Sequence, residues 1–240
     1  MAGRLSGAIL AAGRGQRLRP ASGAVPKPLI DLGGQPLLFR QIDLLIKTGV
    51  SPIHVIVNSE THQMMHQQGL RLPDSVKLTI GDTANSMESL LRLGEQIAPG
   101  FFLLMTVDAV LQAADVHDFV TNATKTIANP GLRLDGALGV VRWRGDAHPL
   151  FAQIEDDGVI TALGEQQSPM VTAGIYLFST AIFVHAAEAR TRGLDAMRRF
   201  LGMLIEKGVR FAALEVPWAI DVDDAADLRA AHEMIARQTE

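Results

Sequence analysis

The sequence has no cysteine among its 240 residues. Disulfide bonds, thiolate zinc sites and cysteine nucleophiles are therefore excluded. It also lacks a long apolar segment near its start, because the first one ends at Gly13. That run is too brief for a signal-peptide core and far too short to span a membrane. We expect a cytoplasmic protein with no membrane partner.

An excess of positive charge is missing as well. The formal net charge is -4 and the pI is near 6.0, which argues against binding of nucleic acid or anionic membranes. No internal repeat or low-complexity linker divides the chain. Hydrophobic residues make up 48% of it, with a mean hydropathy of +0.17, enough for a substantial core. We predict one domain over residues 1–240.

Apolar runs of strand length alternate with segments of helical periodicity through the first half of the chain. Strands are predicted at 7–12, 53–57, 76–80 and 101–108, and helices at 36–48, 61–69 and 113–129. Beyond residue 135 come predicted strands at 136–141, 150–155, 159–163, 171–178 and 211–216, and helices at 181–189, 194–207 and 225–237. This order predicts an α/β fold, a Rossmann-like, mixed and mostly parallel sheet flanked by helices. Small antiparallel additions are expected in the second half.

The loop after the first strand is rich in glycine and positive charge. Gly13 and Gly15 leave backbone N–H groups open to a ligand, because no Cβ intervenes. From residue 13 to residue 30 there are four cations and no carboxylate: Arg14, Arg17, Arg19 and Lys27. Positive charge concentrated against the acidic whole indicates a site for a polyanion.

Two familiar glycine loops do not fit this segment. A dinucleotide-binding loop would need a third glycine where Leu18 stands, and it would open directly into a helix, which Pro20 and Pro26 disfavour. A P-loop would end in Gly-Lys-Ser/Thr, and the chain has no such triplet.

Leu10-Ala11-Ala12-Gly13-x-Gly15-x-Arg17 followed by Pro26-Lys27 resembles the N-terminal motif of nucleotidyltransferases that couple a nucleoside triphosphate (NTP) to a phosphorylated small molecule. The resemblance implies that residues 10–13 and Gly15 bind the NTP. It also implies that Lys27 and Arg17 are catalytic, and we expect both at the surface. The NTP-binding half would cover about 1–130 and the acceptor-binding half about 131–240.

A second polar loop, residues 81–90, follows the third predicted strand. Either Asn85 or Ser86 could be the N-cap of the next helix. In the family this loop recognises the nucleotide base, so the resemblance implies that Asn85 and Ser86 bind the NTP. Capping and base contact can coexist.

Asp108 ends a predicted strand, and ligands of open α/β sheets lie beyond the carboxyl ends of strands, so this aspartate is placed as a metal ligand. Asp221 and Asp223 alternate and would face one side of an extended segment. Asp224 would then cap the last helix. The resemblance implies that all three members of the group Asp108, Asp221 and Asp223 form a metal site, for which Mg²⁺ is the suitable ion.

In the second half, Ala173 to Phe178 resembles the Gly-Ile-Tyr strand of sugar-phosphate nucleotidyltransferases. The resemblance implies acceptor contacts for Glu165 and Gly174, whereas Tyr176 and Phe178 are expected in the core.

The implied activity is Mg²⁺-dependent transfer of a nucleoside monophosphate from an NTP to the phosphate of a sugar 1-phosphate, releasing pyrophosphate. A cytidylyltransferase acting on phosphocholine or another small phosphorylated alcohol is an alternative, as is a molybdopterin-type nucleotidyltransferase. A non-catalytic nucleotide-binding module is a fourth reading, opposed by the presence of Lys27, Asp108 and Asp223. The sequence leaves the base, the acceptor and the oligomeric state open.

Overall fold

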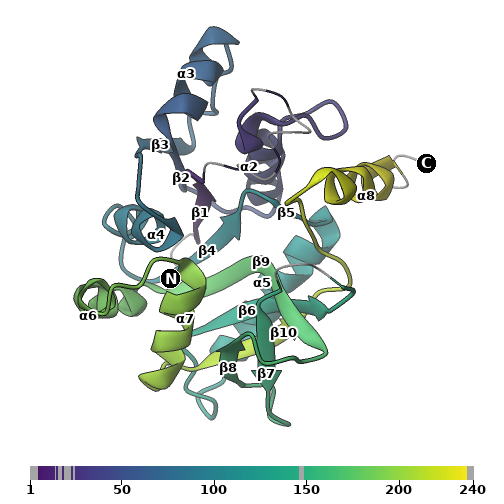
Figure 1. The fold of residues 1–240 in the computed structure, drawn as a ribbon. Helices are drawn as coiled ribbons and strands as arrows, with labels where there is room; N and C mark the ends of the chain where they lie inside the picture. The colour runs from purple at the N-terminus through teal and green to yellow at the C-terminus, as the bar shows by residue number, and fades with distance from the viewer. Residues whose placement is uncertain are drawn as a thin grey trace.

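A computed structural model describes residues 5–13, 15, 18, 23, 25–145 and 149–236. Its centre is a twisted sheet whose main path runs in the order β10-β6-β9-β4-β1-β2-β3 (Figure 1). The strands of this path are β1 (Ser6–Ala11), β2 (Ile53–Val57), β3 (Val76–Ile80), β4 (Phe101–Thr106), β6 (Gly136–Arg142), β9 (Met170–Ser179) and β10 (Phe211–Glu215).

Six of these seven strands run in one direction. β1 pairs in parallel with both β2 and β4, β2 with β3, and β6 with β10. Only β9 runs the opposite way, between β4 and β6. A hairpin of β7 (Phe151–Ile154) and β8 (Ile160–Gly164) joins the sheet through the Phe151↔Val171 pair with β9. The predicted mixed, mostly parallel sheet is confirmed.

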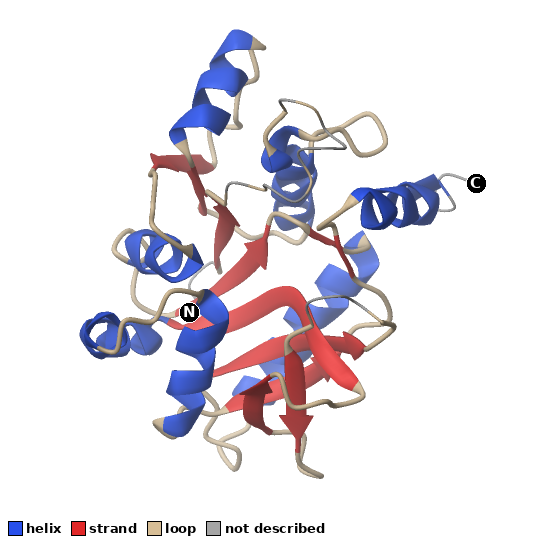
Figure 2. Cartoon of the chain, in the orientation of Figure 1, coloured by secondary structure: helices blue, strands red, loops and turns tan. Residues whose placement is uncertain are grey.

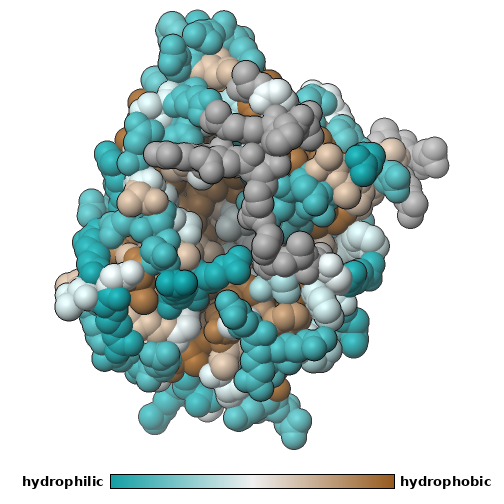
Figure 3. All heavy atoms as spheres, in the orientation of Figure 1, coloured by the Kyte–Doolittle hydropathy of each residue, from teal (hydrophilic) through white to brown (hydrophobic). Residues whose placement is uncertain are grey.

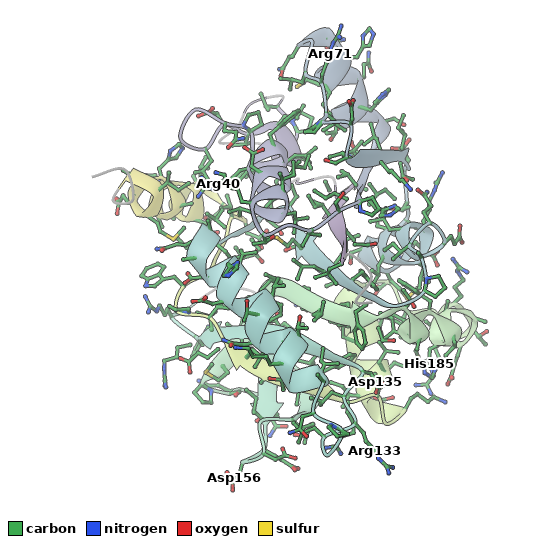
Figure 4. All side chains as sticks on the ribbon, turned by 180° about the vertical axis from the view of Figure 1, so that it is seen from behind. Arg40, Arg71, Arg133, Asp135, Asp156 and His185 are labelled. Atoms are coloured by element: carbon green, nitrogen blue, oxygen red, sulfur yellow. The ribbon has the colours of Figure 1, made fainter. Side chains whose placement is uncertain are left out.

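Helices cover both faces of the sheet, as Figure 2 shows. Two hydrophobic cores result. The first includes side chains of α2 (Leu37–Lys47), α5 (Ala113–Ile127) and α8 (Ala225–Ala236), and the second includes those of α4 (Ser86–Gly94), α6 (Ala186–Thr191) and α7 (Met197–Glu206). The polar helix α3 (Ser59–Gln67) projects at one end, near the labelled Arg71 in Figure 4. None of the helices in the described ranges is long and apolar enough to cross a membrane.

The amino edge of the sheet is closed by its own hydrogen bonds. Asp135, labelled in Figure 4 below α5, precedes β6 and accepts a hydrogen bond at Oδ2 from the Arg210 backbone N–H, 3.0 Å away. Its carbonyl accepts from the Ser179 N–H at 2.8 Å. The amino end of β6 is thus tied to both neighbouring strands.

Three short elements escaped the sequence prediction, and one predicted helix was wrong. The missed elements are the 3₁₀ turn η1 (Lys27–Leu29) and the strands β5 (Ala109–Val110) and β11 (Ile220–Asp221), which pair antiparallel. The predicted helix 181–189 is instead a 3₁₀ segment, η2 (Thr180–His185), followed by α6. Only Ile182 of η2 is buried, so no continuous apolar stripe holds this segment to the α-helical period.

Candidate active site

The candidate site lies at the carboxyl edge of β3, β2, β1 and β4. Because these four strands are parallel, the segments that follow them all emerge at this edge. Figure 3 shows the surface hollowed near the centre of this face, over the ends of the central strands. The glycine loop, the 81–86 loop and Asp108 all belong to this edge.

Lys27 lies in η1, between Pro26 and Pro28, with Pro26 in extended conformation before the turn. Its side chain is 9% exposed, so the prediction that it lies at the surface was wrong. The stem is covered by Gly15, whose φ is +55° and where a Cβ would lie 2.7 Å from the Lys27 Cβ. Glycine at this position therefore allows the loop to close on the lysine.

The Lys27 ammonium bridges two carboxylates that are far apart in sequence. Nζ donates to Asp108 Oδ2 at 2.7 Å and to Asp223 Oδ1 at 2.9 Å. The two aspartates are 25% and 26% exposed, so the ion pairs are partly shielded from water. The structure thus brings together the predicted catalytic lysine and two of the predicted metal ligands.

Each charge in this cluster alters the ionisation of the others. Burial opposes the charged form of Lys27, but Asp108, Asp223 and Asp221 outweigh it and raise the lysine pKa. Burial likewise opposes ionisation of Asp108, yet the Lys27 charge and hydrogen bonds from Lys27 and Thr106 hold its pKa below the usual range. Lys27 is therefore a full cation and Asp108 a full anion at neutral pH.

Asp221 is the third member of the cluster. Loss of hydration and then the nearby Asp108 carboxylate raise its pKa well above the usual range, although the residue as a whole keeps an exposed surface. One ligand oxygen from each of Asp108, Asp221 and Asp223 lies within 4.8 Å of the others. Carboxylate oxygens are the donors that hard divalent cations prefer. The ammonium between two of them shows that the arrangement accepts positive charge, so the residues fit a metal ion.

Gln41 of α2, which the sequence analysis missed, supports the segment that carries Asp108. It is fully buried, and its side-chain amide donates to the carbonyls of Val107, at 3.4 Å, and Ala109. Both neighbours of Asp108 are thereby fixed to α2. A glutamine on a helical stripe gives no local signal of such a role.

Asp227 supports Asp223 in a comparable way. Asp224 is the predicted N-cap, and its Oδ1 accepts from Ala226 N at 2.7 Å and Asp227 N at 3.0 Å. In return, Asp227 Oδ2 accepts from the N–H groups of Asp223 and Asp224 at 2.9 and 3.0 Å. This reciprocal arrangement is a capping box. The Asp-x-x-Asp spacing before a helix could have revealed it.

The glycine loop begins on buried backbone. Leu10, Ala11 and Ala12 are at most 8% exposed, and Gly13 is exposed. Asn58, also missed, caps α3 through Oδ1 and donates from Nδ2 to the carbonyls of Ala12 and Gly13 at 3.2 and 3.4 Å. The carbonyls are turned toward Asn58, which fixes the start of the loop. Arg17 lies outside the described residues.

In the second loop, Asn85 is the N-cap of α4, with its Oδ1 accepting from Glu88 N at 3.0 Å. Ser86 is the first helical residue, and its Oγ accepts from Met197 N of α7 at 2.9 Å. One of the two candidate caps is therefore confirmed. The other candidate, Ser86, instead uses its hydroxyl to bond α7, a helix in the second half of the chain.

The predicted acceptor residues lie in two places. Glu165 lines a cavity of about 320 Å³ between the β7–β8 hairpin and α7, together with Arg192, Arg198 and Arg199. Gly174, with φ +71°, lies against the residue after Asp108, and a Cβ there would be 2.3 Å from the Ala109 Cβ. The lack of a Cβ at Gly174 makes room for Ala109, so this glycine serves close packing beside Asp108.

Tyr176, two residues after Gly174 in β9, is buried, as is Phe178, which confirms both as core residues. Burial raises the Tyr176 pKa to about 12, Asp221 and Asp108 act in the same direction, and Arg198 acts against them.

The lysine bridge and the carboxylate cluster at the carboxyl edge of such a sheet suit a nucleotide-dependent transferase. Comparison with known families agrees. Residues 7–173 match the MobA-like NTP transferase domain, and the chain belongs to this family. This confirms the resemblance and the enzyme class, nucleotidyltransferase, predicted from the sequence.

Relatives extend over most of the chain. It is 24% identical over 241 residues to a UTP–glucose-1-phosphate uridylyltransferase of Haloferax volcanii, covering 96% of each chain. It is 29% identical over 203 residues to a glucose-1-phosphate thymidylyltransferase of Actinoplanes sp., covering 78% of this chain but 62% of that one. For the similar mannose-1-phosphate guanyltransferase beta-B of Xenopus laevis, the match is 28% identical over 187 residues and spans 72% of this chain and 49% of the relative.

Among solved structures, an inositol-1-phosphate CTP transferase from T. maritima is similar, with a TM-score of 0.79, 18% identity and coverage of 99% and 98%. A putative glucose-1-phosphate thymidylyltransferase from Bacillus anthracis is also similar, with a TM-score of 0.78, 18% identity and coverage of 96% and 94%. At these identities the likeness establishes the fold.

Proposed function

We propose that this protein transfers a nucleoside monophosphate from an NTP to the phosphate of a sugar 1-phosphate and releases pyrophosphate. The single observation that carries the proposal is the Lys27 bridge, which joins the segment after the glycine loop to both Asp108 and Asp223. The sugar-1-phosphate substrates named for the sequence relatives support the choice of acceptor.

We place the triphosphate on the glycine loop, within the first 130 residues. The backbone from Leu10 to Gly13 and at Gly15 would face it, with Arg17 neutralising the phosphates that leave as pyrophosphate. The base would lie at the 81–86 loop, near Asn85 and the backbone of Ser86, whose hydroxyl is already bonded to Met197 N. The remaining half, about 131–240, would bind the acceptor.

The acceptor cavity has the charge pattern that a sugar phosphate requires. Arg192, Arg198 and Arg199 offer positive charge to a phosphate, and Glu165 is a hydrogen-bond acceptor for sugar hydroxyls. Arg192 is already paired with Glu188 at 2.7 Å and Glu206 at 3.1 Å. Arg199 is paired as well, with Asp195 at 3.3 Å. We therefore assign the first contact with the acceptor phosphate to Arg198.

In the reaction, an oxygen of the acceptor phosphate forms a bond to the α-phosphorus, and the bond from that phosphorus to the β-phosphate oxygen breaks in line. The electron pair leaves with pyrophosphate. Since the attacking phosphate is already anionic near neutral pH, no strong general base is needed, and catalysis rests on positioning and charge neutralisation. Lys27 is the group that can hold both the α-phosphate and the incoming phosphate.

Asp108, Asp221 and Asp223 would hold Mg²⁺, whose octahedral shell suits carboxylate and phosphate oxygens. When bound, the ion supplies charge neutralisation at the transferring phosphate. Gln41 and the Asp224–Asp227 capping box keep the ligands in place. We further expect this chemistry to run in the cytoplasm.

The test is a screen of ATP, CTP, GTP and UTP, together with dTTP, against glucose 1-phosphate, mannose 1-phosphate, inositol 1-phosphate and phosphocholine. Pyrophosphate release is the measurement. Turnover with a sugar 1-phosphate supports the proposal, and turnover with phosphocholine alone would favour the cytidylyltransferase alternative. No turnover with any pair, despite Mg²⁺ and intact folding, would overturn it.

A further inference from the structure

The helix α7 begins without a cap of its own. Its N-cap position is Ala196, which has the extended φ of -151° and ψ of 147° typical of a capping residue but no side chain that can accept a hydrogen bond. The first N–H groups of a helix need acceptors. For Met197, the first residue of α7, the acceptor comes from elsewhere in the chain.

That acceptor is the hydroxyl of Ser86, which is the first residue of α4 and lies 111 residues away in sequence. The distance from Met197 N to Ser86 Oγ is 2.9 Å. Met197 itself is 6% exposed, so water has little access to replace the bond. Ser86 therefore caps α7, a helix other than its own, across the interface between the two halves of the chain.

The rest of α4 contacts the segment that precedes α7, namely η2 and α6. Glu88 accepts a bidentate pair from Arg190 of α6, with three hydrogen bonds between 2.9 and 3.2 Å. At the other end of α4, Gly94 makes room for Phe183 of η2, since a Cβ there would be 2.4 Å from the ring. The segment from η2 to α7 thus rests along the whole of α4.

We infer that Ser86 is a positioning residue for the acceptor cavity: by capping α7 it holds Arg198 and Arg199, the second and third residues of that helix, at the wall of the cavity that Glu165 also lines. This inference rests on the cavity being the acceptor site proposed above. It assigns the hydroxyl of Ser86 to the acceptor side of the reaction, although the residue belongs to the nucleotide loop.

Ser86→Ala removes the cap, and Ala196→Ser offers α7 a cap of its own without adding charge to the cavity. Loss of a cap is expected to raise the acceptor KM about fivefold, with the NTP KM within about twofold of wild type. The double variant Ser86→Ala/Ala196→Ser should recover the acceptor KM. A contact between Ser86 and the base could not be rescued by a residue on another helix.

Amide hydrogen exchange of residues 197–200 provides a readout that needs no substrate. Exchange should accelerate about fivefold in Ser86→Ala and return toward wild type in the double variant. Ser89→Ala is the matched control. Ser89 belongs to the same helix, and its hydroxyl bonds Thr83 and the Asn85 carbonyl; among the described residues it has no hydrogen bond to α7.

Unchanged exchange in Ser86→Ala would overturn the inference, and so would a rise confined to the NTP KM or a failed rescue by Ala196→Ser. These results presuppose an active wild-type enzyme. An inactive wild type would overturn the proposed function instead, and with it the acceptor role, while exchange would still decide whether Ser86 caps α7.

Discussion

Gly15 lies against Lys27 so closely that a Cβ on the glycine would be 2.7 Å from the Cβ of the lysine. The contact joins the glycine loop to the residue that bridges Asp108 and Asp223. A methyl group added at Gly15 must therefore displace the lysine, whereas a Cβ at Gly13 would meet nothing within 4 Å.

Gly15→Ala is expected to lower turnover by at least about tenfold, because a shift of Lys27 by a few tenths of an ångström disturbs a preorganised cation. It should also lose about 1 kcal/mol of stability, since alanine is strained at φ +55°. Pyrophosphate release and thermal unfolding measure the two effects.

Gly49→Ala is the matched control. Gly49 also has a positive φ, +77°, but a Cβ there meets nothing within 4 Å. This variant should lose similar stability and keep its turnover. If both variants lose turnover equally, strain and not displacement of Lys27 is the cause.

Much of this site could be predicted from the sequence, because its residues stand in short local patterns. The strand before Gly13, the strand that ends at Asp108 and the alternation of Asp221 and Asp223 are patterns within a few residues, and the structure places the predicted lysine and all three aspartates together. The local patterns do not reveal which distant residue each side chain or strand will contact.

Most of the missed features are relationships between distant segments. Gln41 bonds to carbonyls 66 and 68 residues away, and Asn58 to carbonyls 45 and 46 residues away. The insertion of β9 between β4 and β6 is likewise a matter of pairing, because a strand's own sequence does not state which neighbours it will have. The exposure of Lys27 was mispredicted because its cover, Gly15, and its partners come from other parts of the chain.

Lys27→Met should reduce turnover on the order of a hundredfold or more, as expected for loss of a preorganised cation at a developing negative charge. Without the ammonium, three carboxylates face one another, so the metal-free protein should also be destabilised. Because Asp108 and Asp223 retain about a quarter of their exposure, the loss should be below the roughly 3–5 kcal/mol typical of a fully buried broken pair.

The matched variant is Lys27→Arg, which keeps the charge but changes its shape. It should retain most of the metal-free stability and lose most of the turnover. Wild-type turnover in Lys27→Met would exclude a catalytic role for this lysine.

His54 should make stability depend on pH. It is 1% exposed in β2, and its Nδ1 has no hydrogen-bond partner within the described ranges. Burial and then the charge of Lys77 lower its pKa, so on acidification the unfolded chain takes up a proton before the folded one. The stability due to neutral His54 is complete above about pH 6.5 and is lost as the pH falls below it.

Urea unfolding between pH 7.5 and 5.5 measures this slope, which for one proton is at most about 1.4 kcal/mol per pH unit. His54→Leu should flatten it. His66→Gln, at an exposed position of α3, should leave it unchanged. An equal slope in wild type and His54→Leu would assign the pH dependence to other groups.

Glu165→Gln should raise the acceptor KM about tenfold, the cost of weakening a charged hydrogen bond, while changing the NTP KM little. The reason is its place in the cavity with Arg198 and Arg199, away from the glycine loop. Glu155→Gln, an exposed carboxylate after β7 and outside the cavity lining, is the control. Equal changes in both KM values would give Glu165 a structural role.

The proposed metal site requires Asp108 and Asp223 to act together, so substitution of either residue tests it. Asp108→Asn and Asp223→Asn should each abolish turnover supported by Mg²⁺ and reduce the rise in thermal midpoint that Mg²⁺ produces in the wild type. Metal-free stability should change by less than about 1 kcal/mol, since in each variant Lys27 keeps a charged partner in the other aspartate.

Asp224→Asn tests whether these effects belong to the cluster or to any charge in the segment. Its carboxylate caps α8 and is not among the three grouped carboxylates, and asparagine caps almost as well. This variant should therefore keep the Mg²⁺ response and lose at most a few tenths of a kcal/mol. Full wild-type turnover in EDTA, or an unaltered Mg²⁺ response in Asp108→Asn, would contradict a shared metal at this site.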